Sequence, residues 1–125
     1  MMKNLQVLVV DDEPMNLDLA LAVLAREGHE ITLVTNGQEA LDACAAREFD
    51  LILMDINMPV MDGYTATRQL RDRGTLSPIM FVTGSTSGGE EQVALEAGGD
   101  LFMRKPYRRQ QLLDAIGQVL ATPRN

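Results

Sequence analysis

The chain contains no tryptophan, one cysteine and one histidine, and aromatic residues make up only 4% of it. A single cysteine excludes a disulfide framework and a thiolate metal cluster, so we expect Cys44 to be a buried helix residue. A single histidine cannot build a metal site alone. Because His29 lies between Gly28 and Glu30, we expect it in a turn with its ring exposed to solvent. Neither residue is a candidate for chemistry.

Long apolar runs are also missing. The longest, residues 19–25, is far shorter than the roughly 20 residues that a membrane-spanning helix needs. The apolar run near the N-terminus stops at Asp11, too early for a secretion signal. Positive charge is scarce, since 18 acidic against 11 basic side chains give a net charge of -7, which argues against a nucleic-acid surface. We therefore expect a cytoplasmic protein without membrane insertion or direct nucleic-acid binding.

What is present fits one globular domain. The 125 residues are 46% hydrophobic and 23% charged, enough to bury an ordinary core without disulfides or a structural metal. We find no repeat, low-complexity tract or interdomain linker. Residues 1–125 are therefore expected to form a single domain, with no second, effector domain in this chain.

Short apolar runs alternate with segments of helical spacing. The runs lie at 5–10, 30–34, 51–54, 78–82 and 100–103. The helical stripes lie within 17–24, 40–45, 64–71, 93–97 and 108–120. Runs that are apolar at consecutive positions are typical of parallel strands covered on both faces. This α/β pattern predicts a five-stranded parallel sheet with helices on both faces, in the flavodoxin-like order 2-1-3-4-5. Gly88 and Gly89 weaken the start of the fourth helix by roughly 1 kcal/mol each, so we expect that helix to be mobile.

Polar residues stand at the carboxyl ends of four expected strands. Asp11 and Asp12 follow the first strand and Asp55 follows the third. Thr83 follows the fourth strand and Lys105 follows the fifth. Because functional groups of open α/β sheets collect at this edge, we expect all five side chains in one crevice.

The residue types in this crevice favour phosphoryl chemistry. Clustered carboxylates repel one another unless a cation lies among them, and Mg²⁺ suits a sparse set of oxygen ligands completed by water and phosphate. Lys105 and Thr83 offer a charge and a hydroxyl donor to phosphate oxygens. Asp55 is then left as the nucleophile.

Three functions fit such a crevice: a phosphoacceptor switch, an aspartyl-phosphate hydrolase of small phosphate esters, and a flavodoxin-type cofactor binder. The hydrolase needs a second acid two residues after the nucleophile, where this chain has Asn57, and it needs a cap domain. A flavin binder needs aromatic rings to stack, but the chain has only two tyrosines. The loop 84–89 lacks the Gly-Lys-Ser/Thr of a nucleotide loop. The switch is favoured, and the other two remain alternatives.

Four motifs together resemble the receiver domains of two-component response regulators, over nearly the whole chain. They are Val9-Val10-Asp11-Asp12-Glu13, Met54-Asp55-Ile56-Asn57-Met58-Pro59-Val60-Met61-Asp62-Gly63, Val82-Thr83-Gly84 and Arg104-Lys105-Pro106. The resemblance implies a regulatory domain rather than an enzyme acting on other molecules. In such domains the residue matching Asp55 accepts a phosphoryl group from a phosphohistidine of a sensor histidine kinase or a phosphotransfer protein. The surface formed by the fourth helix, fifth strand and fifth helix then changes.

The resemblance also implies a metal site. Asp12 and Asp55 would bind Mg²⁺ directly, with Mn²⁺ as an alternative ion, and the backbone carbonyl of Asn57 would be a third ligand. Asp11 would act through water. Asn57 and Ser85 border the path of hydrolytic water in the family, so they are expected to tune the lifetime of the phosphoryl group.

Thr83 and Lys105 resemble the family's switch pair, which is drawn toward the new phosphate oxygens. Phe102 matches the aromatic residue that then turns inward. Because it lacks the hydroxyl of the more common tyrosine, its outward position gains no hydrogen bond, and we expect a less sharply two-state switch. The family pattern also makes the peptide bond between Lys105 and Pro106 cis.

The downstream partner is open at this point. The chain is either a stand-alone receiver acting on another protein or a piece of a hybrid histidine kinase or longer regulator with a fused output domain. Asn16 and residues 58–71 resemble receivers of hybrid kinases.

Overall fold

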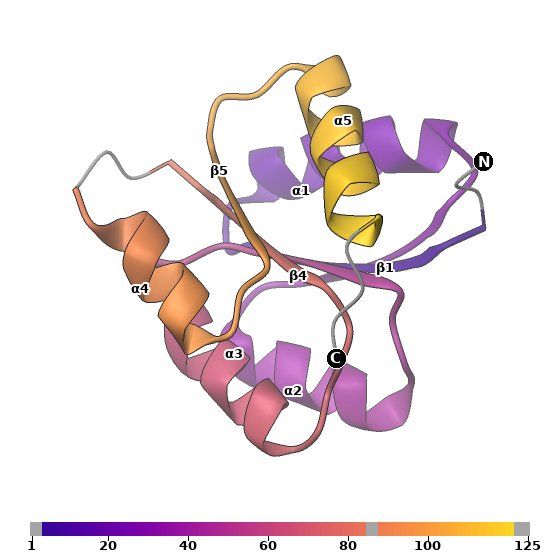
Figure 1. The fold of residues 1–125 in the computed structure, drawn as a ribbon. Coiled ribbons are helices and arrows are strands. Elements are labelled where there is room, and N and C mark those ends of the chain that lie inside the picture. Colours follow the sequence, from indigo (N-terminus) through magenta and orange to yellow (C-terminus); the bar gives the residue numbers. More distant parts are fainter. Residues whose placement is uncertain (1–3, 85–87, 122–125) are drawn as a thin grey trace.

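A computed structural model describes residues 4–84 and 88–121, in which strands and helices alternate along the chain (Figure 1). The strands are β1 (Gln6–Val10), β2 (Glu30–Val34), β3 (Leu51–Met54), β4 (Ile79–Thr83) and β5 (Leu101–Arg104). The helices are α1 (Pro14–Arg26), α2 (Gly37–Ala46), α3 (Gly63–Asp72), α4 (Glu90–Ala97) and α5 (Arg109–Leu120). Within the described residues the strands form one parallel sheet of order β2-β1-β3-β4-β5, which confirms the expected fold.

The strands direct alternate side chains to two separate cores. In β1, Val7 and Val9 join a cluster with apolar residues of α1 and α5, whereas Leu8 and Val10 join a cluster with residues of α2, α3 and α4. Figure 1 shows these two groups of helices on opposite faces of the sheet. Because β1 and β3 are covered on both sides, residues 7–10 and 51–54 are apolar at consecutive positions, which explains these continuous runs in the sequence.

Helix starts follow from local capping. Pro14 occupies the first turn of α1, where its missing N–H leaves no bond unmade. The side chain of Asn36 accepts a hydrogen bond from the Glu39 amide (2.8 Å), and that of Asp62 accepts one from the Thr65 amide (2.9 Å). None of the helices in the described part of the chain combines the length and apolar character that a bilayer crossing requires.

The start of α4 differs from the others. Its N-cap is Gly89, which has φ of +83° and offers no side chain to the free amides of the first turn. A left-handed backbone favours glycine, so this residue is needed for the turn even though it caps the helix poorly. The mobility expected for α4 from Gly88 and Gly89 stays a prediction.

Two single residues depart from expectation. His29 is buried rather than solvated, with 8% exposure, because its Nδ1 accepts a hydrogen bond from the Leu5 amide (3.3 Å). The ring thus supplies an acceptor to a backbone N–H beside the sheet. Cys44 lies in α2 as expected but is half-buried rather than buried.

Candidate functional site

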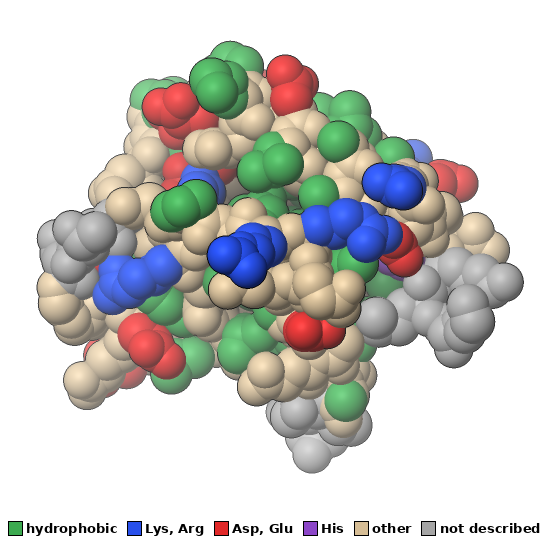
Figure 2. Space-filling model, turned by 90° about the horizontal axis from the view of Figure 1, so that it is seen from above, with side chains coloured by type: hydrophobic (Ala, Val, Ile, Leu, Met, Phe, Trp, Pro, Cys, Tyr) green, Lys and Arg blue, Asp and Glu red, His purple; other side chains and the backbone are tan. Residues whose placement is uncertain are grey.

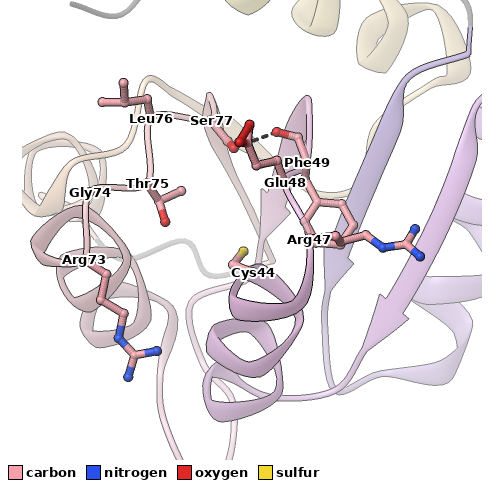
Figure 3. A pocket seen from close by; sticks show the side chains of 9 residues that line it. All are labelled: Cys44, Arg47, Glu48, Phe49, Arg73, Gly74, Thr75, Leu76 and Ser77. Atoms are coloured by element: carbon pink, nitrogen blue, oxygen red, sulfur yellow. Dashed lines mark hydrogen bonds between the residues drawn. The ribbon is translucent and has the colours of Figure 1, made fainter.

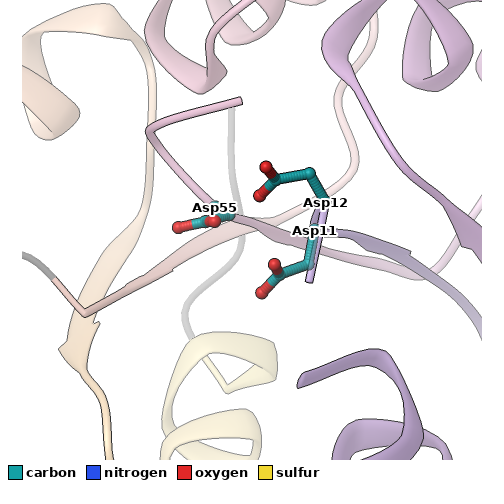
Figure 4. A group of neighbouring side chains, drawn as sticks. All are labelled: Asp11, Asp12 and Asp55. Atoms are coloured by element: carbon teal, nitrogen blue, oxygen red, sulfur yellow. The ribbon is translucent and has the colours of Figure 1, made fainter. Parts of the chain in front are cut away.

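Carboxylates gather where β1 and β3 end. Oxygens of Asp11, Asp12 and Asp55 lie within 4.8 Å of one another, as the sequence predicted (Figure 4). Asp11 and Asp55 are buried, with 4% and 8% exposure, whereas Asp12 is exposed. The cluster therefore has a buried part and a part open to solvent.

Main-chain bonds fix the two buried carboxylates. The Asp55 amide donates to the Val10 carbonyl (2.9 Å) and the Asp11 amide to the Val34 carbonyl (3.1 Å), so the pairing of the strands continues one residue past β1 and β3. The Asp55 backbone also lies against Gly63. A Cβ at that glycine would be 1.9 Å from the Asp55 carbonyl oxygen, so no larger residue fits there.

Lys105 reaches into the cluster from the end of β5. Its Nζ lies 2.5 Å from Asp11 Oδ2 and 3.8 Å from Asp55 Oδ1, and its side chain is 15% exposed. The Lys105 amide donates to the Thr83 carbonyl (2.7 Å). The following bond to Pro106 is cis, as the family resemblance implied. The ammonium is thus placed between two carboxylates.

Burial and the neighbouring carboxylate of Asp11 both raise the pKa of Asp55. Removal from water, and then the neighbouring charge of Asp11, raise the pKa of Asp55 from 3.8 to about 6, while Lys105 and the Ile56 amide that donates to Oδ1 (2.8 Å) oppose the rise. A cation among these carboxylates would offset the repulsion. Mg²⁺ takes one or two protein carboxylates and keeps several waters. The donor set fits this ion, because the exposed side of the cluster, at Asp12, is open to water.

Asp12 and Asp55 line an open cleft of about 270 Å³. It is lined by Asp12, Glu13, Asn16, Asp55, Asn57, Thr83, Gly84 and Lys105. Of the residues expected in the crevice, Thr83 is the last residue of β4 and is 1% exposed, and Asn57 is exposed. Ser85 lies outside the described residues.

Two contacts at the site were not predicted. Asn16 Nδ2 donates to Asp11 Oδ1 (3.4 Å). Because Asn16 lies in the first turn of α1, directly after the end of β1, its place in the sequence could have indicated this contact. Phe102 is partly buried on β5, and the Arg104 guanidinium lies 5.2 Å from the centre of its ring. No sequence pattern signals the second contact, because it depends on the rotamer of a long side chain.

A second hollow lies away from this edge, between the end of α2 and the segment that joins α3 to β4 (Figure 3). The Cys44 thiol faces it, and Ser77 Oγ donates to the Phe49 carbonyl (2.6 Å) at its wall. Burial raises the pKa of the Cys44 thiol, which favours its protonated, less nucleophilic form. The carboxylate cleft is the better candidate for chemistry.

Comparisons with known proteins agree with this geometry. The family model for the response regulator receiver domain matches residues 7–117. Two-component response regulator 24 of Arabidopsis thaliana is 42% identical over 117 residues, which cover 93% of this chain and 84% of that protein. Sensor histidine kinase RcsC of Salmonella typhi is 36% identical over 118 residues, 94% of this chain but only 12% of the kinase. The chain thus corresponds to one small part of such kinases.

Solved structures give the same result. The receiver domain of sensor histidine kinase PA1611 from Pseudomonas aeruginosa, with a magnesium ion coordinated in its active site cleft, superimposes with a TM-score of 0.88 at 31% identity, covering 95% of this chain and 99% of that one. A CheY-like receiver domain protein from Methanospirillum hungatei gives a TM-score of 0.87 at 29% identity, covering 97% and 95%. Receiver domains bind Mg²⁺ in an acidic pocket and interact with histidine kinases. The chain belongs to the response regulator receiver family, the phosphoryl-accepting signalling domains of two-component systems.

Proposed function

We propose that Asp55 is the phosphoryl acceptor of this receiver, and that the donor is a phosphohistidine of a sensor histidine kinase or a phosphotransfer protein. The observation that carries the proposal is the position of the Asp55 carboxylate, at the inner wall of the cleft and 3.8 Å from Lys105 Nζ. An Asp55 oxygen attacks phosphorus and the new O–P bond replaces the N–P bond, whose electron pair stays on the imidazole nitrogen; the ring leaves neutral because its other nitrogen carries a proton. With a pKa of about 6, Asp55 is mostly ionised at neutral pH and able to attack.

We assign direct Mg²⁺ coordination to Asp12, Asp55 and the backbone carbonyl of Asn57, with Mn²⁺ as an alternative ion. When bound, the ion neutralises charge that develops on the transferred phosphoryl group. Asp11 acts through water in this proposal. Its two oxygens already accept hydrogen bonds, Oδ1 from the Glu13 amide (3.0 Å) and Oδ2 from Lys105 (2.5 Å), which supports an indirect role.

The response to phosphorylation starts at Thr83 and Lys105 in this proposal. The Thr83 hydroxyl and the Lys105 ammonium move toward the phosphoryl oxygens, and Phe102 fills the space beside β4. The output is a changed surface of α4, β5 and α5. Asn57 and Ser85 adjust how long the phosphoryl group lasts.

The alternative functions find less support in the cleft. Asn57, which lines it, has an amide where an aspartyl-phosphate hydrolase needs a second acid. Among the described residues, those that line the cleft carry no aromatic side chain on which a flavin could stack. We therefore propose a phosphoacceptor that catalyses only its own phosphorylation and dephosphorylation.

Incubation with Mg²⁺ and acetyl phosphate tests the acceptor. Mass spectrometry of the intact protein should show one added phosphoryl group on the wild type and none on Asp55→Asn. Asp18→Asn, at an exposed position of α1, is the matched control and should be labelled like the wild type. Equal labelling of Asp55→Asn would contradict the assignment of Asp55.

A further inference from the structure

The carboxyl end of α4 is fastened by a side chain of α3. Arg71 Nε donates to the Gly98 carbonyl (3.0 Å), and its Nη2 bonds the Asp100 carboxylate (2.9 Å). Its Nη1 donates to the carbonyls of Thr75 and Ser77, each at 2.8 Å. Because the Arg71 and Asp100 side chains are only 13% and 20% exposed, these charge-assisted bonds are shielded from water.

Close packing reinforces this attachment. Gly98 has φ of +118°, and a Cβ there would lie 2.7 Å from the Arg71 side chain. A Cβ on Gly99 would lie 2.7 Å from the ring of Phe81 in β4. Asp100 Oδ2 also accepts a hydrogen bond from the Ile79 amide (2.9 Å). The end of α4 is therefore tied to α3 and to β4 at once.

The amino end of α4 has longer contacts. The Tyr64 hydroxyl donates to the Glu90 carbonyl at 3.4 Å, and Arg104 Nη1 lies 3.8 Å from Glu90 Oε1. That oxygen is buried and has no hydrogen-bond partner among the described residues. At such distances a hydrogen bond is weak or absent, so Glu90 is held mainly by charge attraction.

The middle of α4 offers little resistance to movement. Across the helix, all of which is described, the buried residues are Ala94 and Ala97. Alanine methyl groups do not insert deeply between the side chains of neighbouring elements, so the helix can tilt without repacking a large side chain.

We propose that Arg71 and Asp100 form a fixed pivot at the carboxyl end of α4, and that the contact between Arg104 and Glu90 is a releasable latch at its amino end. Arg104 is suited to this because it precedes Lys105 and pairs in register with Thr83, so a shift of either residue is passed to it. The release of the latch by phosphorylation rests on the function proposed above. The unequal attachment of the two ends of α4 does not depend on that function.

Amide hydrogen exchange of the unphosphorylated protein, followed by NMR, tests the pivot. The comparison uses amides that are hydrogen-bonded: Val93, which donates to the Gly89 carbonyl (3.2 Å), and Gly99, which donates to the Ala94 carbonyl (3.0 Å). Val93 should be protected about tenfold less than Gly99, because local opening is easier where fewer contacts hold the chain. Equal protection would overturn the proposal.

Two variants separate the ends. Glu90→Gln removes the charge that attracts Arg104 and should lower the protection of Val93 severalfold without changing that of Gly99. Asp100→Asn should lower the protection of Gly99. The control Glu91→Gln removes an exposed charge from the same turn and should change neither. If Glu90→Gln lowers protection equally at both ends, α4 opens as one unit and there is no pivot.

Beryllofluoride with Mg²⁺, which mimics a phosphoryl group on aspartate, then tests the release. On addition of beryllofluoride the wild type should lose protection at Val93 while Gly99 keeps its protection. In Glu90→Gln the protection of Val93 should already be low before beryllofluoride is added. If Asp55 were not the acceptor, beryllofluoride would change nothing, yet the differences between the variants would remain. If the pivot were absent, Asp55 would still be labelled by acetyl phosphate, so the two failures are distinguishable.

Discussion

Lys105 lies closer to Asp11 than to Asp55, with 2.5 Å from Nζ to Asp11 Oδ2 and 3.8 Å to Asp55 Oδ1. The ammonium is therefore held by a carboxylate that is not the proposed acceptor. In the proposed response, a phosphoryl group on Asp55 draws Lys105 away from Asp11, so this ion pair would set part of the free energy of the response.

Replacing Asp11 should lower the pKa of Asp55. Asp11→Asn removes a negative neighbour and frees Lys105 to approach Asp55, and both changes favour the ionised carboxyl. A carbon-13 NMR titration of the Asp55 carboxyl without metal should give a value below about 6. Asp18→Asn should leave the titration unchanged, and an unchanged value in Asp11→Asn would show that the two carboxylates do not interact.

Stability without metal should fall as Asp55 ionises. Because its pKa rises from 3.8 to about 6 on folding, its contribution is fully present below pH 3.8 and is lost as the pH rises through 6. The loss amounts to at most about 3 kcal/mol. Asp55→Asn should thus gain stability relative to the wild type between pH 4 and 8. Urea denaturation with a chelator measures it, and a difference independent of pH would refute it.

Mg²⁺ should raise the melting temperature, because it binds the folded cluster and not the unfolded chain. At a hundredfold excess over Kd the gain is about 2.7 kcal/mol. Asp12→Ala should abolish the rise, whereas Asp18→Ala, at another exposed position, should keep it. Differential scanning fluorimetry over a range of Mg²⁺ concentrations measures the effect. A full response in Asp12→Ala would remove Asp12 from the proposed ligands.

Gly63→Ala should destabilise the fold strongly, by more than about 2 kcal/mol, because backbone must move to relieve the contact with the Asp55 carbonyl. Phosphorylation should be impaired as well. Gly84→Ala is the matched control, since a Cβ there meets nothing within 4 Å and the backbone is not left-handed. Denaturation curves of both variants test this, and equal stability of the two would show that the backbone around Gly63 yields easily.

The sheet was predictable because strands buried on both faces leave continuous apolar runs. β2 and β3 have the expected bounds, but β4 and β5 each lie one residue further along the chain. Thr83 and Arg104 pair with each other as the last residues of these strands. Hydropathy cannot reveal this, since backbone hydrogen bonds, not side-chain polarity, decide where a strand ends.

The carboxylate cluster was predictable for a related reason, because parallel strands bring their carboxyl ends to one edge. Contacts that join distant segments through long side chains were not. The hold of Arg71 on Gly98 and the position of Arg104 over Phe102 depend on rotamers and on packing. The second contact also bears on the expectation that Phe102, without a hydroxyl, gains nothing in its outward position. The cation–π contact with Arg104 gives its ring an attraction there that does not need a hydroxyl.

The amide of Asp55 is bonded to Val10, and its carbonyl is in close contact with Gly63. The acceptor is therefore tightly held on its β1 side, whereas the start of α4 is held by longer contacts, those of Glu90 with Tyr64 (3.4 Å) and Arg104 (3.8 Å). A force applied at Asp55 should produce the largest displacement where the structure is least rigid. On the proposals made above, the direction in which the signal travels is set by this difference in rigidity, before a partner protein binds.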